Sequence, residues 1–116
     1  HLVMHGECFS AATLIALGAE QRQIMPNAFV MMHQLRSACS GTLQEIRVDT
    51  RNCNRYHSIM TQIYNEHLTL NEVEIENELV DDMVMSAERA VEIGLAHEVL
   101  VPPQRRSRRK RKTKAR

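Results

Sequence analysis

Near its start the chain reads LVMHGECFSAATLIALG, residues 2–18. The first three residues are apolar and typical of the end of a strand, and Gly6 then predicts a turn. Ser10 stands where a helix N-cap is expected, because most of residues 11–17 are strong helix formers. They are apolar enough all round that we expect the helix to be buried, and Gly18 offers its stop. This stretch therefore predicts a strand, a tight turn and a helix.

Two short runs with strand propensity follow, at residues 22–25 and 29–33. They are separated by Pro26 and Asn27, a typical turn pair. His33 ends the second run, so we expect its imidazole at the rim of the sheet.

The middle of the chain predicts one long helix. Thr42 with Glu45 three residues later forms a capping-box pattern, and neither Gly nor Pro interrupts the chain until after Leu68. Apolar residues recur mostly at three- and four-residue steps: Leu43, Ile46, Cys53, Tyr56, Met60, Ile63 and Tyr64. A helix of about seven turns is too long to be covered along its whole length by so small a domain. We expect part of this apolar stripe to meet another subunit, the alternative being a helix lying across its own sheet.

The last part of the body predicts shorter elements. Helix starts are indicated at Asn71 and Ser86, strands at residues 83–85 and 98–101, and Gly94 marks a helix stop. The alternation gives about four strands joined by crossover helices. It predicts a layered α/β fold.

Charge divides the chain into an acidic body and a basic tail. Nine of the twelve residues 105–116 are Lys or Arg, whereas residues 1–104 hold all fourteen acids against six Arg. Pro102 and Pro103 stand between these parts, and paired prolines end regular backbone hydrogen bonding. We therefore expect a folded domain over residues 1–101 and a basic, disordered tail over residues 102–116.

Composition excludes several classes of protein. No apolar run approaches the roughly 20 residues of a membrane span. Three cysteines without CxxC spacing, Cys8, Cys39 and Cys53, favour free thiols over a disulfide framework or zinc site, and predict no metal or cofactor. A reducing compartment follows, the cytoplasm or alternatively an organelle matrix. Because the apolar run begins directly after His1, we expect that this sequence starts partway through a longer protein and lacks that protein's N-terminal region.

Three residues far apart in the chain have the chemistry of a catalytic triad. Ser10 lies at a strand-to-helix turn, which exposes a hydroxyl and aims backbone N–H groups at a developing oxyanion. Taken singly, Ser10 reads as an N-cap, His33 as an edge histidine and Asp82 as a solvated carboxylate. Together they supply a nucleophile, a base and an orienting acid, and a triad is defined by geometry rather than chain order.

Three motifs resemble the proteolytic subunit of the Clp protease, the ClpP family. Residues 6–10 occupy the place of its nucleophile turn, and Pro26–Asn27 with residues 30–34 match the segment around its catalytic histidine. The phrase at residues 85–95 is similar to its C-terminal signature, whose aspartate stands four residues before Ser86. The chain is identified as a divergent member, covering the C-terminal part of the family's crotonase-like layered fold.

The resemblance implies a role for each site residue. Ser10 would be the nucleophile, His33 the general base and acid, and Asp82 the group that fixes the imidazole. The backbone N–H of Ala11 would be one oxyanion donor, and residues 42–68 would be the long handle helix. The family also implies stacked heptameric rings, an ATP-driven AAA+ unfoldase as partner, and unfolded proteins or peptides as substrates.

Other readings of the chain remain open. A Ser/Lys dyad is excluded because the first lysine is Lys110, in the tail. Crotonases that bind acyl-CoA need no Ser/His/Asp set, so the presence of all three residues favours a peptidase. A non-catalytic ring subunit that retains the triad residues is one alternative. A protein that binds nucleic acid or another partner through its basic tail is another, although no aromatic residues interleave there for base stacking.

Overall fold

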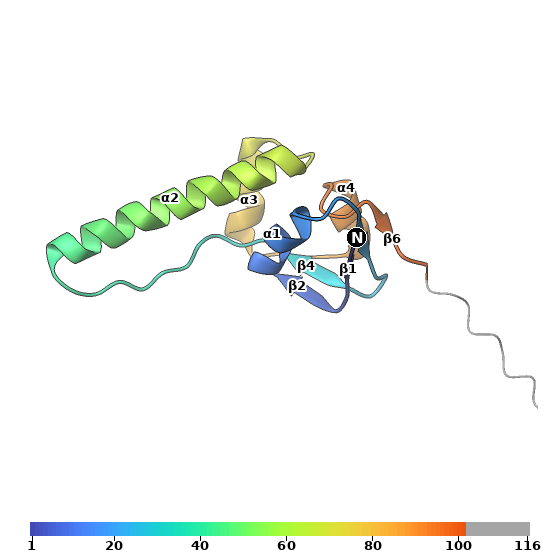
Figure 1. Cartoon of the computed structure of the whole chain (residues 1–116), viewed down its shortest axis with the longest axis horizontal. Helices are drawn as coiled ribbons and strands as arrows, with labels where there is room; N and C mark the ends of the chain where they lie inside the picture. Colours follow the sequence, from blue (N-terminus) through green and yellow to red (C-terminus); the bar gives the residue numbers. More distant parts are fainter. Residues whose placement is uncertain (102–116) are drawn as a thin grey trace, which may run out of the picture.

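The computed structural model describes residues 1–101, so the predicted basic tail lies outside the described residues. Within residues 1–101 the chain forms six strands and four helices (Figure 1). In chain order they are β1 (Leu2–Met4), β2 (Glu7–Phe9), α1 (Ala11–Leu17), β3 (Arg22–Ile24), β4 (Phe29–Met31), α2 (Leu43–His67), α3 (Glu72–Asp81), β5 (Val84–Met85), α4 (Ala87–Glu92) and β6 (Glu98–Val99). The α/β fold and the long helix predicted from the sequence are confirmed.

The strands form two small sheets. β1, β3 and β6 make a parallel sheet in the order β1-β3-β6, and the second sheet has the order β2-β4-β5. In the second sheet β2 and β4 run parallel, while β5 is antiparallel to β4. Twice in succession the chain passes from the first sheet to the second, from β1 to β2 and from β3 to β4.

Strand β2 was not predicted. The sequence suggested a turn from Gly6 onward, and Gly6 does have a positive φ of 68°. The turn is a single sharp bend, however, after which Glu7–Phe9 pairs along β4. A strand of three residues that begins with a glutamate offers no run of apolar residues, so only its pairing identifies it.

Helix α1 is less buried than its composition suggested. Thr13, Ala16 and Leu17 are buried, but Ile15 on the opposite side is 70% exposed. The expectation of a buried helix was wrong for Ala11, Ala12 and Ile15, which are exposed, because the main contacts of α1, with β2 and α2, leave these side chains uncovered. Its outer face stays uncovered by the described residues.

A buried arginine ties the first sheet to the chain that follows α4. Arg22 in β3 is buried, and its guanidinium donates to the carbonyl oxygens of Ala19 at 2.9 Å, Gly94 at 3.1 Å and Leu95 at 3.0 Å. Burial lowers the pKa of Arg22, since desolvation disfavours the charged form. The bonds to Gly94 and Leu95 anchor the turn between α4 and β6 against β3, and the bond to Ala19 holds the turn between α1 and β3.

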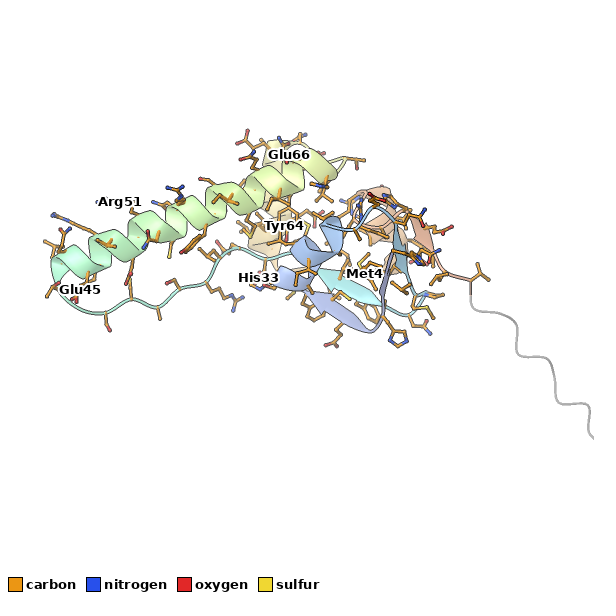
Figure 2. All side chains as sticks on the ribbon, viewed as in Figure 1. Met4, His33, Glu45, Arg51, Tyr64 and Glu66 are labelled. Carbon is orange, nitrogen blue, oxygen red and sulfur yellow. The ribbon has the colours of Figure 1, made fainter. Side chains whose placement is uncertain are left out.

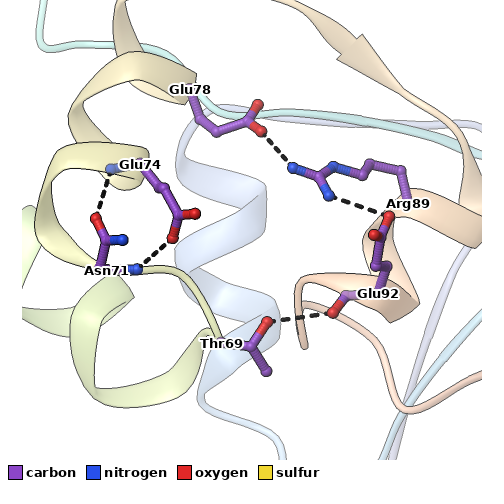
Figure 3. Close-up of polar contacts among 6 residues, drawn as sticks. All are labelled: Thr69, Asn71, Glu74, Glu78, Arg89 and Glu92. Atoms are coloured by element: carbon purple, nitrogen blue, oxygen red, sulfur yellow. Dashed lines mark hydrogen bonds and ion pairs between the residues drawn. The ribbon is translucent and has the colours of Figure 1, made fainter.

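Helices α3 and α4 are joined by an ion-pair network (Figure 3). Arg89 of α4 contacts Glu78 of α3 at 2.9 Å and Glu92 of its own helix at 3.0 Å. These two carboxylates raise the pKa of Arg89, because each favours the charged guanidinium. At the start of α3, Asn71 and Glu74 form a capping box. The network fixes the orientation of α3, whose last residue immediately precedes Asp82.

Helix α2 begins at the predicted capping box of Thr42 and Glu45. Figure 1 shows most of the helix projecting away from the sheets. Of its 25 residues only Tyr64, near the C-terminal end, is fully buried. The described structure therefore does not lay this helix across its own sheet. No helix among residues 1–101 has both the length and the apolar character needed to cross a bilayer.

Candidate active site

The second sheet brings Ser10, His33 and Asp82 to one edge. Ser10 follows the last residue of β2, and His33 comes two residues after the end of the parallel strand β4. Asp82 comes two residues before β5, which is antiparallel to β4 and therefore starts at the edge where β4 ends. The register aligns Phe9 with Met31 and Met31 with Val84, so the three candidates lie beyond one row of paired residues.

Ser10 is held in a conformation that ordinary helix capping does not require. Its φ of 57° and ψ of −122° lie outside the usual N-cap region, and its side chain makes no capping hydrogen bond. The backbone N–H of Ser10 donates to the Met31 carbonyl oxygen at 2.9 Å, which continues the pairing of β2 with β4. A strained serine whose hydroxyl does not cap the helix favours a reactive role over a capping one.

Two buried hydroxyls support the turn at Ser10 from below. The Thr13 hydroxyl donates to the Ser10 carbonyl oxygen at 2.6 Å, and the Thr13 and Tyr64 hydroxyl oxygens are 2.7 Å apart. Both side chains are buried, and Tyr64 comes from the end of α2 that lies over the body (Figure 2). Burial raises the pKa of Tyr64. The network links the turn at Ser10 to α2.

The segment after β4 holds His33 close to α3. The backbone N–H of Gln34 donates to the carbonyl oxygen of Leu79 in α3 at 2.9 Å. The His33 ring nitrogen Nδ1 lies 2.7 Å from the Gln34 carbonyl oxygen. A hollow of about 240 Å³ adjoins this segment and is lined by Gln34 and Leu35 with Cys53, Asn54 and His57 of α2.

Asp82 ends α3 in the left-handed region, with φ 48° and ψ 32°. Aspartate is among the few residue types that adopt this region readily. Its Oδ2 atom forms an ion pair with Nη2 of Arg36, and its Oδ1 atom is buried without a hydrogen-bond partner among residues 1–101. Oδ2 is therefore paired with the exposed Arg36 guanidinium, whereas the buried Oδ1 can still accept a hydrogen bond.

The three candidate side chains share an edge but do not yet form a hydrogen-bonded chain. Among residues 1–101, His33 bonds to a carbonyl oxygen and Asp82 to Arg36, rather than to each other. Catalytic hydrogen bonds are often long or unmade without substrate, so this arrangement is compatible with a triad. No group of three or more potential metal ligands occurs in the described part of the chain.

Sequence reasoning missed Thr13, Tyr64 and Arg36. Thr13 is the one polar residue in the apolar run 11–17, and such an interruption is a signal for a buried hydrogen bond. Tyr64 was assigned to the apolar stripe without regard to its hydroxyl. Nothing in the local sequence links Arg36 to Asp82, because their contact depends on the fold.

Comparison with known proteins shows the family to which the chain belongs. The sequence model of the Clp protease family matches residues 1–103. The chain belongs to the Clp protease family. The resemblance noted in the sequence is thereby confirmed, and the two small sheets with a long helix are a partial form of this family's fold.

Relatives of this Clp protease chain carry consistent names. The chain is 32% identical over 95 residues to the ATP-dependent Clp protease proteolytic subunit of Dehalococcoides mccartyi. The match covers 81% of the chain and 48% of the relative. It is 30% identical to proteolytic subunit 1 of Rhodopirellula baltica, over 81% of the chain and 42% of that relative. The Clp protease chain thus spans about half the length of these relatives.

Proposed function

We propose that the chain is part of a Clp-type serine endopeptidase subunit in which Ser10, His33 and Asp82 form the catalytic triad. One observation carries the proposal: two parallel strands end, and an antiparallel strand begins, at the sheet edge beside these residues. The half-buried Ser10 side chain adds support, because it is not used to cap α1 and its hydroxyl is therefore available for chemistry. Family membership supplies the reaction class.

The proposed mechanism passes through an acyl-enzyme. His33 accepts the proton of the Ser10 hydroxyl as Oγ bonds to the carbonyl carbon of the substrate. The backbone N–H of Ala11, the first residue of α1, donates to the resulting oxyanion. His33 then protonates the leaving amine as the C–N bond breaks, and water, deprotonated by the same imidazole, releases the peptide acid. Asp82 holds the imidazole in the required tautomer.

The wider assignment follows the family. We propose unfolded proteins or short peptides as substrates, a ring of copies as the assembly, an ATP-driven unfoldase as partner, and the cytoplasm as location. In this proposal residues 1–101 form the peptidase domain and residues 102–116 a separate basic segment. Nucleic-acid binding by that segment is the alternative, and it concerns residues outside the described part.

A fluorophosphonate probe tests the triad directly. The protein is expressed with any sequence that its gene encodes upstream of His1, and the labelled residue is identified by mass spectrometry. We expect covalent labelling at Ser10, abolished by Ser10→Ala and slowed at least about 100-fold by His33→Ala, because the imidazole is the base that activates the hydroxyl.

The matched control for this test is Ser86→Ala. Ser86 caps α4 through a bond from the Arg89 N–H at 3.2 Å, so it is a serine with an ordinary structural role. Its substitution is expected to leave labelling at Ser10 intact. A folded protein that shows no labelling at Ser10 would instead be the non-catalytic ring subunit.

A further inference from the structure

The side chain that holds Asp82 is Arg36, a residue outside the triad. Arg36 lies three positions after His33, on the same segment that leaves β4, and its Nη2 atom pairs with Oδ2 of Asp82. We infer that Arg36 is a positioning residue, which orients the Asp82 carboxylate so that Oδ1 receives the imidazole of His33. This inference rests on the proposed triad and adds a fourth residue to it.

The two oxygens of Asp82 differ in their surroundings. Oδ2 is engaged by a guanidinium that is 72% exposed, whereas Oδ1 is buried and has no partner among the described residues. A buried carboxylate oxygen without a donor is costly, and such atoms are nearly always satisfied in folded proteins. Oδ1 is therefore an acceptor that a donor from the site can satisfy.

His33 carries the donor that fits this vacancy. A neutral imidazole has one N–H, and in a triad the Nδ1–H points to the carboxylate. In the structure Nδ1 of His33 is instead 2.7 Å from the Gln34 carbonyl oxygen, a contact within two adjacent residues. Rotation of the side chain releases this local contact and leaves the backbone in place.

Two ties join the segment that carries His33 to the end of α3 that carries Asp82. The first is the backbone bond from the Gln34 N–H to the Leu79 carbonyl oxygen at 2.9 Å, and the second is the Arg36–Asp82 pair. Both ties start just C-terminal to His33, at Gln34 and Arg36. They end at Leu79 in the last turn of α3 and at its C-cap, Asp82. Without Arg36, the backbone bond alone leaves the Asp82 side chain free to change rotamer.

An activity comparison tests the role of Arg36. We expect Arg36→Ala to lower the rate of Ser10 labelling and the kcat for a short peptide by about 10- to 100-fold, because small misplacements of catalytic groups cost up to that much. KM is expected to stay unchanged, since the proposed role of Asp82 is to orient His33 and not to bind substrate. Arg36→Lys and added guanidinium ion are each expected to restore part of the rate, because each returns a cation to Oδ2.

The control for this comparison is Arg51→Ala, an exposed arginine on α2, which we expect to leave the rate unchanged. A rate for Arg36→Ala equal to or above that of the wild type would overturn the inference. A higher rate would mean that Arg36 keeps Asp82 away from His33.

A second measurement does not depend on activity. In protein labelled with ¹⁵N-histidine, we expect a downfield Nδ1 proton for His33 that persists in Arg36→Lys and disappears in Arg36→Ala and Asp82→Asn. If this signal follows Arg36 but Ser10 is never labelled, the positioning role stands and the peptidase proposal falls. If Arg36→Ala leaves the signal intact, the positioning role is wrong even in an active enzyme.

Discussion

The hydroxyls of Thr13 and Tyr64 connect the turn at Ser10 to the C-terminal end of α2, although Thr13 and Tyr64 are 51 residues apart in sequence. Tyr64 donates to Thr13, and Thr13 donates to the Ser10 carbonyl oxygen, so each hydroxyl proton has one acceptor. Both residues are at most 1% exposed, and water cannot replace a lost partner there. The two hydroxyls therefore couple α2 to the turn at Ser10, and substituting them measures the strength of that coupling.

Removing the two hydroxyls is predicted to be non-additive. We expect Tyr64→Phe to lower the free energy of unfolding by about 1 kcal/mol and Thr13→Val by about 1 to 3 kcal/mol, because the latter leaves two groups unsatisfied. In urea unfolding, the double variant should cost at least about 0.5 kcal/mol less than the sum of the single variants.

Tyr56→Phe provides the control for the Tyr64 substitution. Tyr56 lies on the same helix but is 59% exposed, so its hydroxyl is expected to be dispensable. Strict additivity of Thr13→Val and Tyr64→Phe would contradict the coupling between α2 and the turn.

The residues of the site differ in how readily sequence identifies them. Ser10, His33 and Asp82 were selected because their side chains carry the chemistry and their neighbours match family motifs, and the sheet order then brought them to one edge. Arg36 has neither property. Its pairing with Asp82 arises because β4 and β5 are neighbours, and a contact between residues 46 positions apart has no local signature.

Among the elements, the start of α2 shows how a short sequence pattern fixes a helix end. The Thr42 N–H donates to Glu45 Oε2 at 2.7 Å, and the Glu45 N–H donates to Thr42 Oγ1 at 3.3 Å. Gly41 has a φ of 141°, and a Cβ there would come within 2.6 Å of Glu45 Oε2. The capping box and the glycine before it therefore belong to one compact turn.

This helix end is predicted to be sensitive to acid. Hydrogen bonds from Thr42 lower the pKa of Glu45 below its ordinary value of 4.5. A lowered carboxyl pKa in the folded state stabilises the fold above the ordinary value, and that stabilisation disappears as pH falls through the lowered pKa. We expect the Cα chemical shifts of residues 43–46 to move toward coil values below pH 4.5, measured by NMR between pH 6 and pH 3.

A matched pair of variants separates capping from charge. Glu45→Gln keeps an acceptor for the Thr42 N–H and should abolish the pH dependence. Glu66→Gln, near the other end of α2, should leave the dependence as it is. First-turn shifts in the wild type that are constant down to pH 3 would show that Glu45 does not hold this end.

Helix starts were predicted more successfully than strand pairing and helix burial. Both α2 and α3 begin at the residues expected, because a capping box is a short-range pattern of hydrogen bonds that the sequence displays directly. Strand β2 was missed and α1 was expected to be fully buried. Strand pairing and helix burial depend on neighbours that are distant in sequence, and no periodicity within three to seven residues encodes them.

At the scale of the whole molecule, most of α2 has no other element of the described residues packed against it. Several of its apolar side chains are exposed in the described structure, among them Leu43 at 64%, Tyr56 at 59% and Ile59 at 47%. Isolated exposed apolar residues are common, but a helix that projects from the body and repeats them over four turns is typical of an interface. The proposed ring assembly supplies the partner for this surface.

Assembly is therefore predicted to depend on α2. We expect the protein, expressed with any sequence upstream of His1, to sediment as an oligomer, and the double variant Leu43→Asp/Tyr56→Asp to shift it toward smaller species, because each carboxylate would need to be desolvated in an apolar interface. Val73→Asp introduces one such carboxylate at a valine of α3 that is 70% exposed, and it should leave the oligomer intact. Analytical ultracentrifugation distinguishes the species. If the α2 variant and the wild type sediment alike while Val73→Asp dissociates, the interface lies on α3, and the projecting helix has another use.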